Sequence, residues 1–276
     1  ARKVQAVASG ALASGDTVVV NSDGTVSVVE GVVGGTGTPV VFAAFNSTYQ
    51  AAAFDSSNNK VVIAYCQDAS PQYGYAVVGT VSGTSISFGT PVVFHSAETV
   101  LTFAVFDSNS NKVVITYRDG GAANHGKAVV GTVSGTSISF GGEATFNSGD
   151  TDYPTAAFDS NSNKVVITYR DTSNSSYGTA IVGTISGTSI SFGSETVFES
   201  QRVDYVFPTF DSTNNKIVVA YRVFSGNREG YAKVGTVSGT SISFGSSTQF
   251  ESGQTNHITS TFDSSNNKVV IAYRDD

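Results

Sequence analysis

Apolar and polar residues follow one another in short runs along this chain, and the same order of runs returns five times. The clearest copy is Phe158–Asp171, in which a polar turn of Asp, Ser and Asn precedes the mostly apolar run Lys164–Tyr169. The copies begin 52 residues apart, at Phe54, Phe106, Phe158, Phe210 and Phe262. A fixed period of this size is typical of repeat architectures.

Each copy predicts four short antiparallel strands. The first strands are expected at Ala51–Phe54, Phe103–Phe106, Thr155–Phe158, Phe207–Phe210 and Ser260–Phe262. The polar turn leads to a second strand, such as Lys164–Tyr169, and a variable loop leads to a third, such as Thr179–Ile185. The turn Ser186–Thr188 then leads to a fourth strand, Ser189–Phe192. Four strands per unit, with a period of roughly 40–50 residues, are typical of a propeller blade.

The second strand is apolar throughout and does not alternate. A propeller explains this pattern, because neighbouring blades cover both faces of each blade. The sequence therefore predicts an all-β fold, a five-bladed β-propeller that forms a single domain over residues 1–276. Its repeats are expected to begin near residues 43, 95, 147, 199 and 251.

Residues 1–41 match the repeat poorly. Short strands are expected there at Val4–Ala8, Thr17–Val20 and Thr25–Val29, and the Asn, Asp and Gly between the last two favour a hairpin turn. The fifth copy holds two inner strands alone, within Ser260–Asp275. We expect the strands of residues 1–41 to complete that copy and close the ring, which removes open sheet edges. The alternative is an open solenoid of five stacked sheets.

Composition narrows the classes of function. Charged residues make up 13% of the chain, and the net charge is -7. Nucleic-acid binding is disfavoured, because it needs a cationic surface. No apolar run approaches the roughly 18–20 residues of a membrane span. Cys66 is the single cysteine, which excludes an internal disulfide framework and suggests an incidental thiol.

The repeats differ from one another at one end. The turns after the first and third strands are nearly constant, and both lie at one end of an antiparallel unit. The loops after the second strand and the links after the fourth lie at the other end, and both vary from copy to copy. A rigid scaffold that presents variable loops is the usual form of a recognition surface.

Two columns of side chains at the variable end carry candidate chemistry. One column precedes the loop glycine, at Tyr73, His125, Tyr177 and Glu229. The other lies in the links, at Tyr49, Leu101, Tyr153, Tyr205 and His257. Polar residues lie near them in sequence, namely Asn124, Asn174, Asp152, Asp204 and Arg228. Rings beside amides and carboxylates suit carbohydrate or peptide binding. The alternative is that these rings pack the loops onto the scaffold.

An arginine ends the second strand in four copies, at Arg118, Arg170, Arg222 and Arg274. An aspartate follows it in three of them. The favoured interpretation is a set of ion pairs between repeats, and the alternative is a ring of arginines beside an anionic ligand.

Metal binding and catalysis are not expected. Asp107 and Asp159 begin turns with the first spacings of a calcium loop, but the Gly and the distal Glu of that loop are absent, so Asx turns are favoured. Catalysis needs an acid and a base in different environments, whereas most acids here are repeated copies. We expect no catalytic residues, no metal and no cofactor.

The repeated block Gly131–Gly141, together with the Phe-Asp-Ser turn, resembles tandem repeats of structural proteins of marine bacteriophages, particularly those of cyanobacteria. The lead-in Ser9–Val26 resembles the lead-in of such proteins. The resemblance covers nearly the whole chain. In architecture the chain is also similar to five-bladed lectins of the tachylectin-2 type, although the period differs and no Trp is present.

These resemblances imply a virion or tail-fibre module, at an extracellular or virion surface, that binds host-surface carbohydrate through its variable loops. They also imply assembly into a homo-oligomer or a larger virion structure. The rival interpretation is a structural spacer whose loops bind nothing. A lesser alternative is an enzyme like the five-bladed glycosidases, for which the first strands offer no lone carboxylate.

Overall fold

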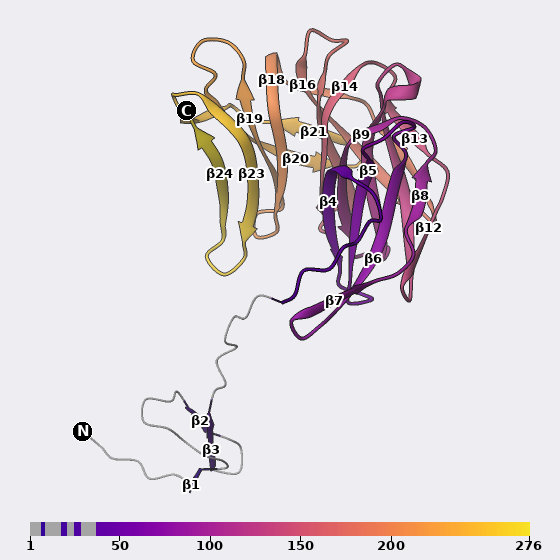
Figure 1. Ribbon diagram of the computed structural model, residues 1–276. Helices are drawn as coiled ribbons and strands as arrows, with labels where there is room; N and C mark the ends of the chain where they lie inside the picture. The colour runs from indigo at the N-terminus through magenta and orange to yellow at the C-terminus, as the bar shows by residue number, and fades with distance from the viewer. Residues whose placement is uncertain (1–6, 9–17, 21–24, 29–36) are drawn as a thin grey trace, which may run out of the picture. The chain divides into compact units, whose positions relative to one another are not determined.

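The structure, a computed structural model, describes residues 7–8, 18–20, 25–28 and 37–276 (Figure 1). It is an all-β protein built from several antiparallel sheets. The single helical element in the described part is the short 3-10 turn η1 (Gly120–Ala122). The chain divides into two compact units, residues 1–39 with Gly83–Ser85, and Val40–Ser82 with Ile86–Asp276. The larger unit holds the repeats, whereas the repeat period predicts one domain over residues 1–276.

The strands of the larger unit follow the predicted order in every repeat. The first repeat contains β4 (Ser47–Asp55), β5 (Lys60–Gln67), β6 (Gly74–Ser82), β7 (Ser85–Phe88) and β8 (Val92–His95). The second contains β9 (Thr99–Asp107), β10 (Lys112–Asp119), β11 (His125–Ser134), β12 (Ser137–Phe140) and β13 (Ala144–Asn147). The third contains β14 (Thr151–Asp159), β15 (Lys164–Asp171), β16 (Tyr177–Ser186), β17 (Ser189–Phe192) and the start of β18 (Thr196–Asp211). The last two contain the rest of β18, β19 (Lys216–Val223), β20 (Gly230–Ser238), β21 (Ser241–Phe244), β22 (Thr248–Glu251), β23 (Thr255–Asp263) and β24 (Lys268–Asp275).

Each repeat is an antiparallel meander in which the fourth position holds two short strands. In the second repeat, β12 and β13 both pair with β11, one toward each end of it. In the third repeat the second of these strands is continuous with the next first strand. The long strand β18 therefore pairs with β16 at its start and with β19 at its end, and it joins two repeats into one sheet.

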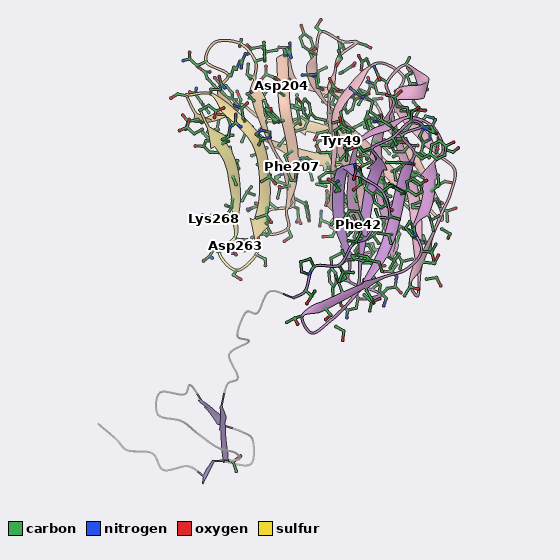
Figure 2. All side chains as sticks on the ribbon, in the orientation of Figure 1. Phe42, Tyr49, Asp204, Phe207, Asp263 and Lys268 are labelled. Carbon is green, nitrogen blue, oxygen red and sulfur yellow. The ribbon has the colours of Figure 1, made fainter. Side chains whose placement is uncertain are left out.

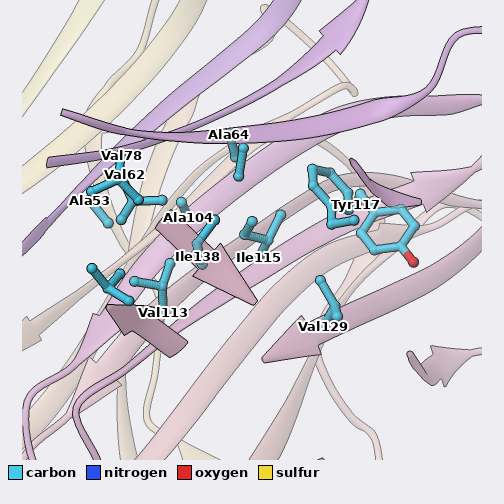
Figure 3. Packing of buried hydrophobic residues seen from close by; sticks show 13 residues of the cluster. Ala53, Val62, Ala64, Val78, Ala104, Val113, Ile115, Tyr117, Val129 and Ile138 are labelled. Carbon is cyan, nitrogen blue, oxygen red and sulfur yellow. The ribbon is translucent and has the colours of Figure 1, made fainter. Parts of the chain in front are cut away.

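The hydrophobic core lies between successive repeats. One cluster combines Val62 and Val78 of the first repeat with Val113, Ile115 and Tyr117 of the second (Figure 3). Two further clusters join the second repeat to the third and the third to the fourth. Along β15, successive residues enter different clusters, which confirms that both faces of a second strand are covered and explains its unbroken apolar run.

A Phe–Tyr contact recurs at each junction and explains the invariant loop glycine. The rings of Phe146 and Tyr169 lie 5.2 Å apart, and the equivalent pairs are Phe42–Tyr65, Phe94–Tyr117, Phe198–Tyr221 and Phe250–Tyr273. A Cβ atom added at Gly178 would lie 2.5 Å from the ring of Phe198. The backbone must therefore lie directly against the ring, which no larger residue permits.

Residues 38–42 repeat Thr90–Phe94, and the structure gives them the matching place. Phe42 packs against Tyr65 and Phe88, as Phe94 packs against Tyr117 and Phe140. Phe42 thus lies on the first repeat in the position that the end of a preceding repeat occupies elsewhere.

The constant turns are Asx turns, as predicted. The Oδ1 atom of Asp159 accepts hydrogen bonds from the backbone N–H groups of Asn161 and Ser162, each at 3.0 Å. The equivalent carboxylates of Asp55, Asp107, Asp211 and Asp263 accept the same two bonds. Asn163 closes its turn with φ of 54°, which Asn tolerates well.

The expected closure of the fifth repeat by residues 1–41 falls largely outside the described residues. The predicted hairpin is present, since β2 (Val18–Val20) pairs antiparallel with β3 (Thr25–Val28). β1 (Val7–Ala8) pairs with β3 in parallel. Both edges of β3 are therefore occupied within this small sheet.

The side chains of β24 are more exposed than those of the equivalent inner strands. β24 pairs with β23, and these two strands form a separate sheet. Tyr273 is 37% exposed, whereas the equivalent Tyr169 is fully buried. Residues of the fifth repeat thus match residues of the inner repeats in sequence but are less buried.

Candidate functional site

The antiparallel order places the constant turns and the variable loops at opposite ends of the repeats. Figure 2 shows Asp263 and Lys268, which flank a constant turn, at the lower end of the view and Asp204 near the upper end. The predicted site residues lie at or near the variable end, in the loops after the second strands and in the links into the first strands.

A β-bulge interrupts every first strand just after its link. The residues at these bulges have left-handed backbone angles, with φ between 50° and 56°, and they are Tyr49, Leu101, Tyr153, Tyr205 and His257. A bulky side chain rarely adopts this conformation, and each instance carries local strain of about 1–2 kcal/mol. Strain repeated in every copy marks a shared structural demand on this column of residues.

The bulge residues meet in an aromatic row. The rings of Tyr153 and Tyr205 lie 5.5 Å apart, and those of Tyr205 and His257 lie 5.1 Å apart. Tyr49, Leu101 and Tyr153 line a pocket of about 150 Å³, together with residues that include Phe103. The first strands β4, β9, β14, β18 and β23 lie side by side in this order, so the row crosses all five repeats.

An alternating belt of arginine and acidic or amide side chains supports the row. Asp152 binds both Arg118 and Arg170, and Asp204 binds both Arg170 and Arg222. Arg222 also donates to the side chain of Asn256. Each arginine therefore reaches across to the next repeat, which confirms ion pairs between repeats. The partners are link residues and not the aspartates that follow the arginines in sequence.

Belt and row are in direct contact. The guanidinium of Arg170 lies 5.2 Å from the ring centre of Tyr153, and that of Arg222 lies 4.7 Å from that of Tyr205. Burial lowers the pKa of Arg170, but hydrogen bonds and attraction from Asp152 outweigh it and raise the pKa above its ordinary value. Burial also raises the pKa of Tyr153. The row therefore presents neutral phenols over charged, fixed guanidinium groups.

The loops after the second strands are tied to the neighbouring links by periodic backbone hydrogen bonds. Thr99, Thr151, Val203 and Thr255 donate to the loop carbonyl groups of Gln72, Asn124, Ser176 and Arg228, at 2.8–3.1 Å. Between loop and link lies a cleft, which we call the loop–link cleft. It measures about 350 Å³ at Ser70–Gln72 and Glu98, and about 410 Å³ at Gly226–Arg228, Gly253 and Gln254.

These two clefts lie three periods apart, so they occupy the same place in the first and fourth repeats. Their chemistry differs, since Glu98 lines the first and Arg228 the fourth. The two variable sequence columns, loop and link, are thus the two walls of one recurring cleft.

The loop column proves separate from the aromatic row. Tyr73, His125 and Tyr177 are half-buried, and none belongs to a ring pair among the described residues. Glu229 accepts a hydrogen bond from the Tyr231 hydroxyl at 2.5 Å. Asn124 and Asn174 contribute backbone carbonyl groups that bind the link and the loop, and Arg274 binds Asp276 at the exposed fifth repeat. The structure therefore brings together the link tyrosines, His257, the belt arginines, Asp152 and Asp204.

A charged cluster at the junction of the first two repeats was not predicted. His95 lies 3.2 Å from Asp119 and 2.6 Å from Glu143, and Lys127 binds both carboxylates. Burial raises the pKa of Asp119, but hydrogen bonding by Lys127 and attraction by His95 outweigh it and leave the pKa below its ordinary value. Lys127 and Glu143 lie far from His95 in the sequence, so the sequence carried no local signal of this cluster.

Cys66 takes the belt position in the first repeat and is fully buried. Burial raises the pKa of its thiol to about 12, so the thiolate is disfavoured. Because Cys66 carries no charge, the belt of charged side chains begins at Arg118 of the second repeat. The described residues contain no group of three or more side chains that could hold a metal ion. They also contain no helix with the length and apolar character that a membrane crossing needs.

Comparison with known proteins extends the description of the fold. No family model matches the chain, and no curated protein matches it. A protein of unknown function from Dyadobacter fermentans is similar in structure, with a TM-score of 0.61 and 10% identity over 85% of this chain and 77% of that one. A protein from Lactobacillus plantarum is similar with a TM-score of 0.58 and 10% identity, over 94% of this chain and 70% of that one. At these identities the likeness concerns the fold alone.

Proposed function

We propose that the five repeats are the blades of a β-propeller, and that the chain is a non-catalytic module that binds carbohydrate at its variable end. The side-by-side order of the first strands supports the propeller. The contact between Phe103 and Phe207, at 5.5 Å, supports it further, because it joins the second repeat to the fourth across a shared axis. On the phage resemblance, we further propose that the module belongs to a virion or tail-fibre protein at an extracellular surface.

The observation that carries the carbohydrate proposal is the aromatic row over the Arg–Asp belt. A sugar ring has an apolar C–H face that packs on aromatic side chains, and hydroxyl groups at its edge that need fixed polar partners. Tyr153, Tyr205 and His257 offer the ring faces, and the belt beneath them fixes their positions.

The spacer interpretation predicts a different role for the rings of Tyr153, Tyr205 and His257. Rings that serve packing alone are needed for stability but not for binding. Rings that serve recognition are needed for binding beyond any effect on stability.

Substitution of the row tests the proposal. We expect Tyr153→Ala and Tyr205→Ala to weaken binding to immobilised polysaccharides at least about tenfold, since an interface ring often contributes above ~1.4 kcal/mol. The panel would hold neutral and charged members, such as dextran, mannan, xylan and dextran sulfate. Binding would be measured by biolayer interferometry and the melting temperature by calorimetry.

Thr213→Ala is the matched control in the fourth repeat, because Thr213 lies in the constant turn at the opposite end. It should bind like the wild type. A blank panel for the wild-type protein, or equal losses in the control, would support the spacer and refute the proposal.

A further inference from the structure

Arg228 lines the loop–link cleft of the fourth repeat, and Arg202, from the preceding link, shares an aromatic ring with it. The guanidinium of Arg202 lies 3.9 Å from the ring centre of Phe224, and that of Arg228 lies 4.9 Å from it. Phe224 is held in place, because its backbone N–H donates to the carbonyl group of Arg202 at 2.8 Å. Phe224 thus holds Arg202 near Arg228, and the belt residue Arg222 lies 5.8 Å from the same ring centre.

Neither guanidinium has a carboxylate to itself among the described residues. Arg228 makes no salt bridge among the described residues, and the neighbouring Glu229 accepts a hydrogen bond from Tyr231. Arg202 lies 3.8 Å from Asp204, but that carboxylate already binds Arg170 and Arg222. Stacking on a ring leaves the N–H edge of a guanidinium available to a further acceptor.

The arrangement belongs to this repeat alone. Arg228 is replaced by Gln72, Asn124 and Ser176 at the equivalent positions, and Phe224 by Asp68, Gly120 and Thr172. The place of Arg202 is taken by Glu98 and Asp150 in the two preceding repeats. In a chain of net charge -7, Arg228 at the cleft with Arg202 on the same ring is a local reversal of sign.

We propose that this cleft binds an anionic substituent, a carboxylate or a sulfate ester, on a saccharide. This inference rests on the proposed carbohydrate function and names the class of sugar. The planar fork of a guanidinium matches the oxygen pairs of carboxylate and sulfate groups. Asn227 and Gln254, which also line the cleft, offer amides for neighbouring hydroxyl groups. Its volume of about 410 Å³ is within the usual range for small-ligand sites.

Dextran in three forms tests the charge requirement on one backbone. The probes are neutral dextran, carboxymethyl dextran and dextran sulfate, titrated calorimetrically at low ionic strength. We expect the wild-type protein to bind at least one charged form more tightly than the neutral form. The two charged probes distinguish carboxylate from sulfate recognition.

Single substitutions test the residues. We expect Arg228→Gln and Arg202→Gln to weaken binding of the preferred charged form at least about tenfold, as loss of a charge-assisted hydrogen bond does. Lys216→Gln is the matched control. Lys216 lies beside the constant turn of the same repeat, and its substitution also removes one positive charge. It should leave binding unchanged.

Three results would overturn the inference. These are an Arg228→Gln variant that binds like the wild type, an equal loss in Lys216→Gln, and equal binding of neutral and charged dextran. If Tyr205-dependent binding of a neutral polysaccharide persisted in any of these cases, the carbohydrate proposal would stand without the anionic assignment. If no polysaccharide bound at all, both would fail.

Discussion

Tyr169→Ala is expected to destabilise the protein by about 3–5 kcal/mol, the usual range for removing a buried aromatic ring. Tyr169 is fully buried between the second and third repeats, and its ring lies 5.2 Å from that of Phe146. Its hydroxyl donates to Glu195 at 2.9 Å, so the substitution also leaves that carboxylate without its donor. Chemical denaturation would measure the loss, and the melting temperature should fall by roughly 10 °C for a chain of this size.

Tyr273→Ala is the internal control for this prediction. Tyr273 occupies the same position in the fifth repeat and packs on Phe250, but it is 37% exposed. The variant should melt close to the wild type. A loss as large as that of Tyr169→Ala would show that β24 is covered in solution, and it would contradict the exposed edge described for the fifth repeat.

Arg222→Ala is expected to destabilise the protein by about 3–5 kcal/mol, because it breaks a buried ion pair and leaves a charge without one of its partners. Arg222 is 6% exposed and binds Asp204 at 2.5 Å. It also donates to Asn256 and stacks on Tyr205, so its loss removes support from the aromatic row. Polysaccharide binding should therefore fall together with stability.

Arg274→Ala tests whether burial is the reason. Arg274 is the equivalent belt residue of the fifth repeat, but its side chain is 59% exposed and pairs with Asp276. Exposed ion pairs contribute little, so this variant should differ little from the wild type in stability. Equal losses in the two variants would show that the belt acts through something other than its burial.

The repeat made most of the fold readable from the sequence. The period placed five copies, and the apolar run of Lys164–Tyr169 predicted a strand covered on both faces, as found. The Asx turns followed from Asp159 and its neighbours for a local reason, since a carboxylate binds the backbone amides two and three residues on. Local chemistry repeated in every copy is the easiest information to recover.

The first strands were predicted too short, because their bulges oppose residue preference. Thr155–Phe158 was expected, whereas β14 begins at Thr151 and runs through the bulge at Tyr153. Tyrosine rarely adopts a positive φ, so residue preferences do not predict a bulge at this position. The parallel pairing of β1 with β3 was missed for a related reason, since strand propensity does not identify the partner strand. The hairpin of β2 and β3 was predicted, because its turn residues are local.

The contacts among the candidate site residues could not be predicted from the sequence. The spacing identified Arg118, Arg170 and Arg222, yet their partners Asp152 and Asp204 come from the next repeat's link. Such contacts depend on how repeats are rotated against one another, which the order of residues does not state. The stacking of Arg202 and Arg228 on Phe224 occurs in one repeat alone, so the periodicity of the sequence does not reveal it.

Amide hydrogen exchange of the wild-type protein, with and without the panel polysaccharide that binds most tightly, tests the central claim most directly. Carbohydrate recognition at the variable end predicts slower exchange in the links that hold Tyr153, Tyr205 and His257 and in the loops beside them. It predicts no change in the constant turns that follow Asp159 and Asp211. Protection of the constant turns, or no protection anywhere at saturating polysaccharide, would contradict the account.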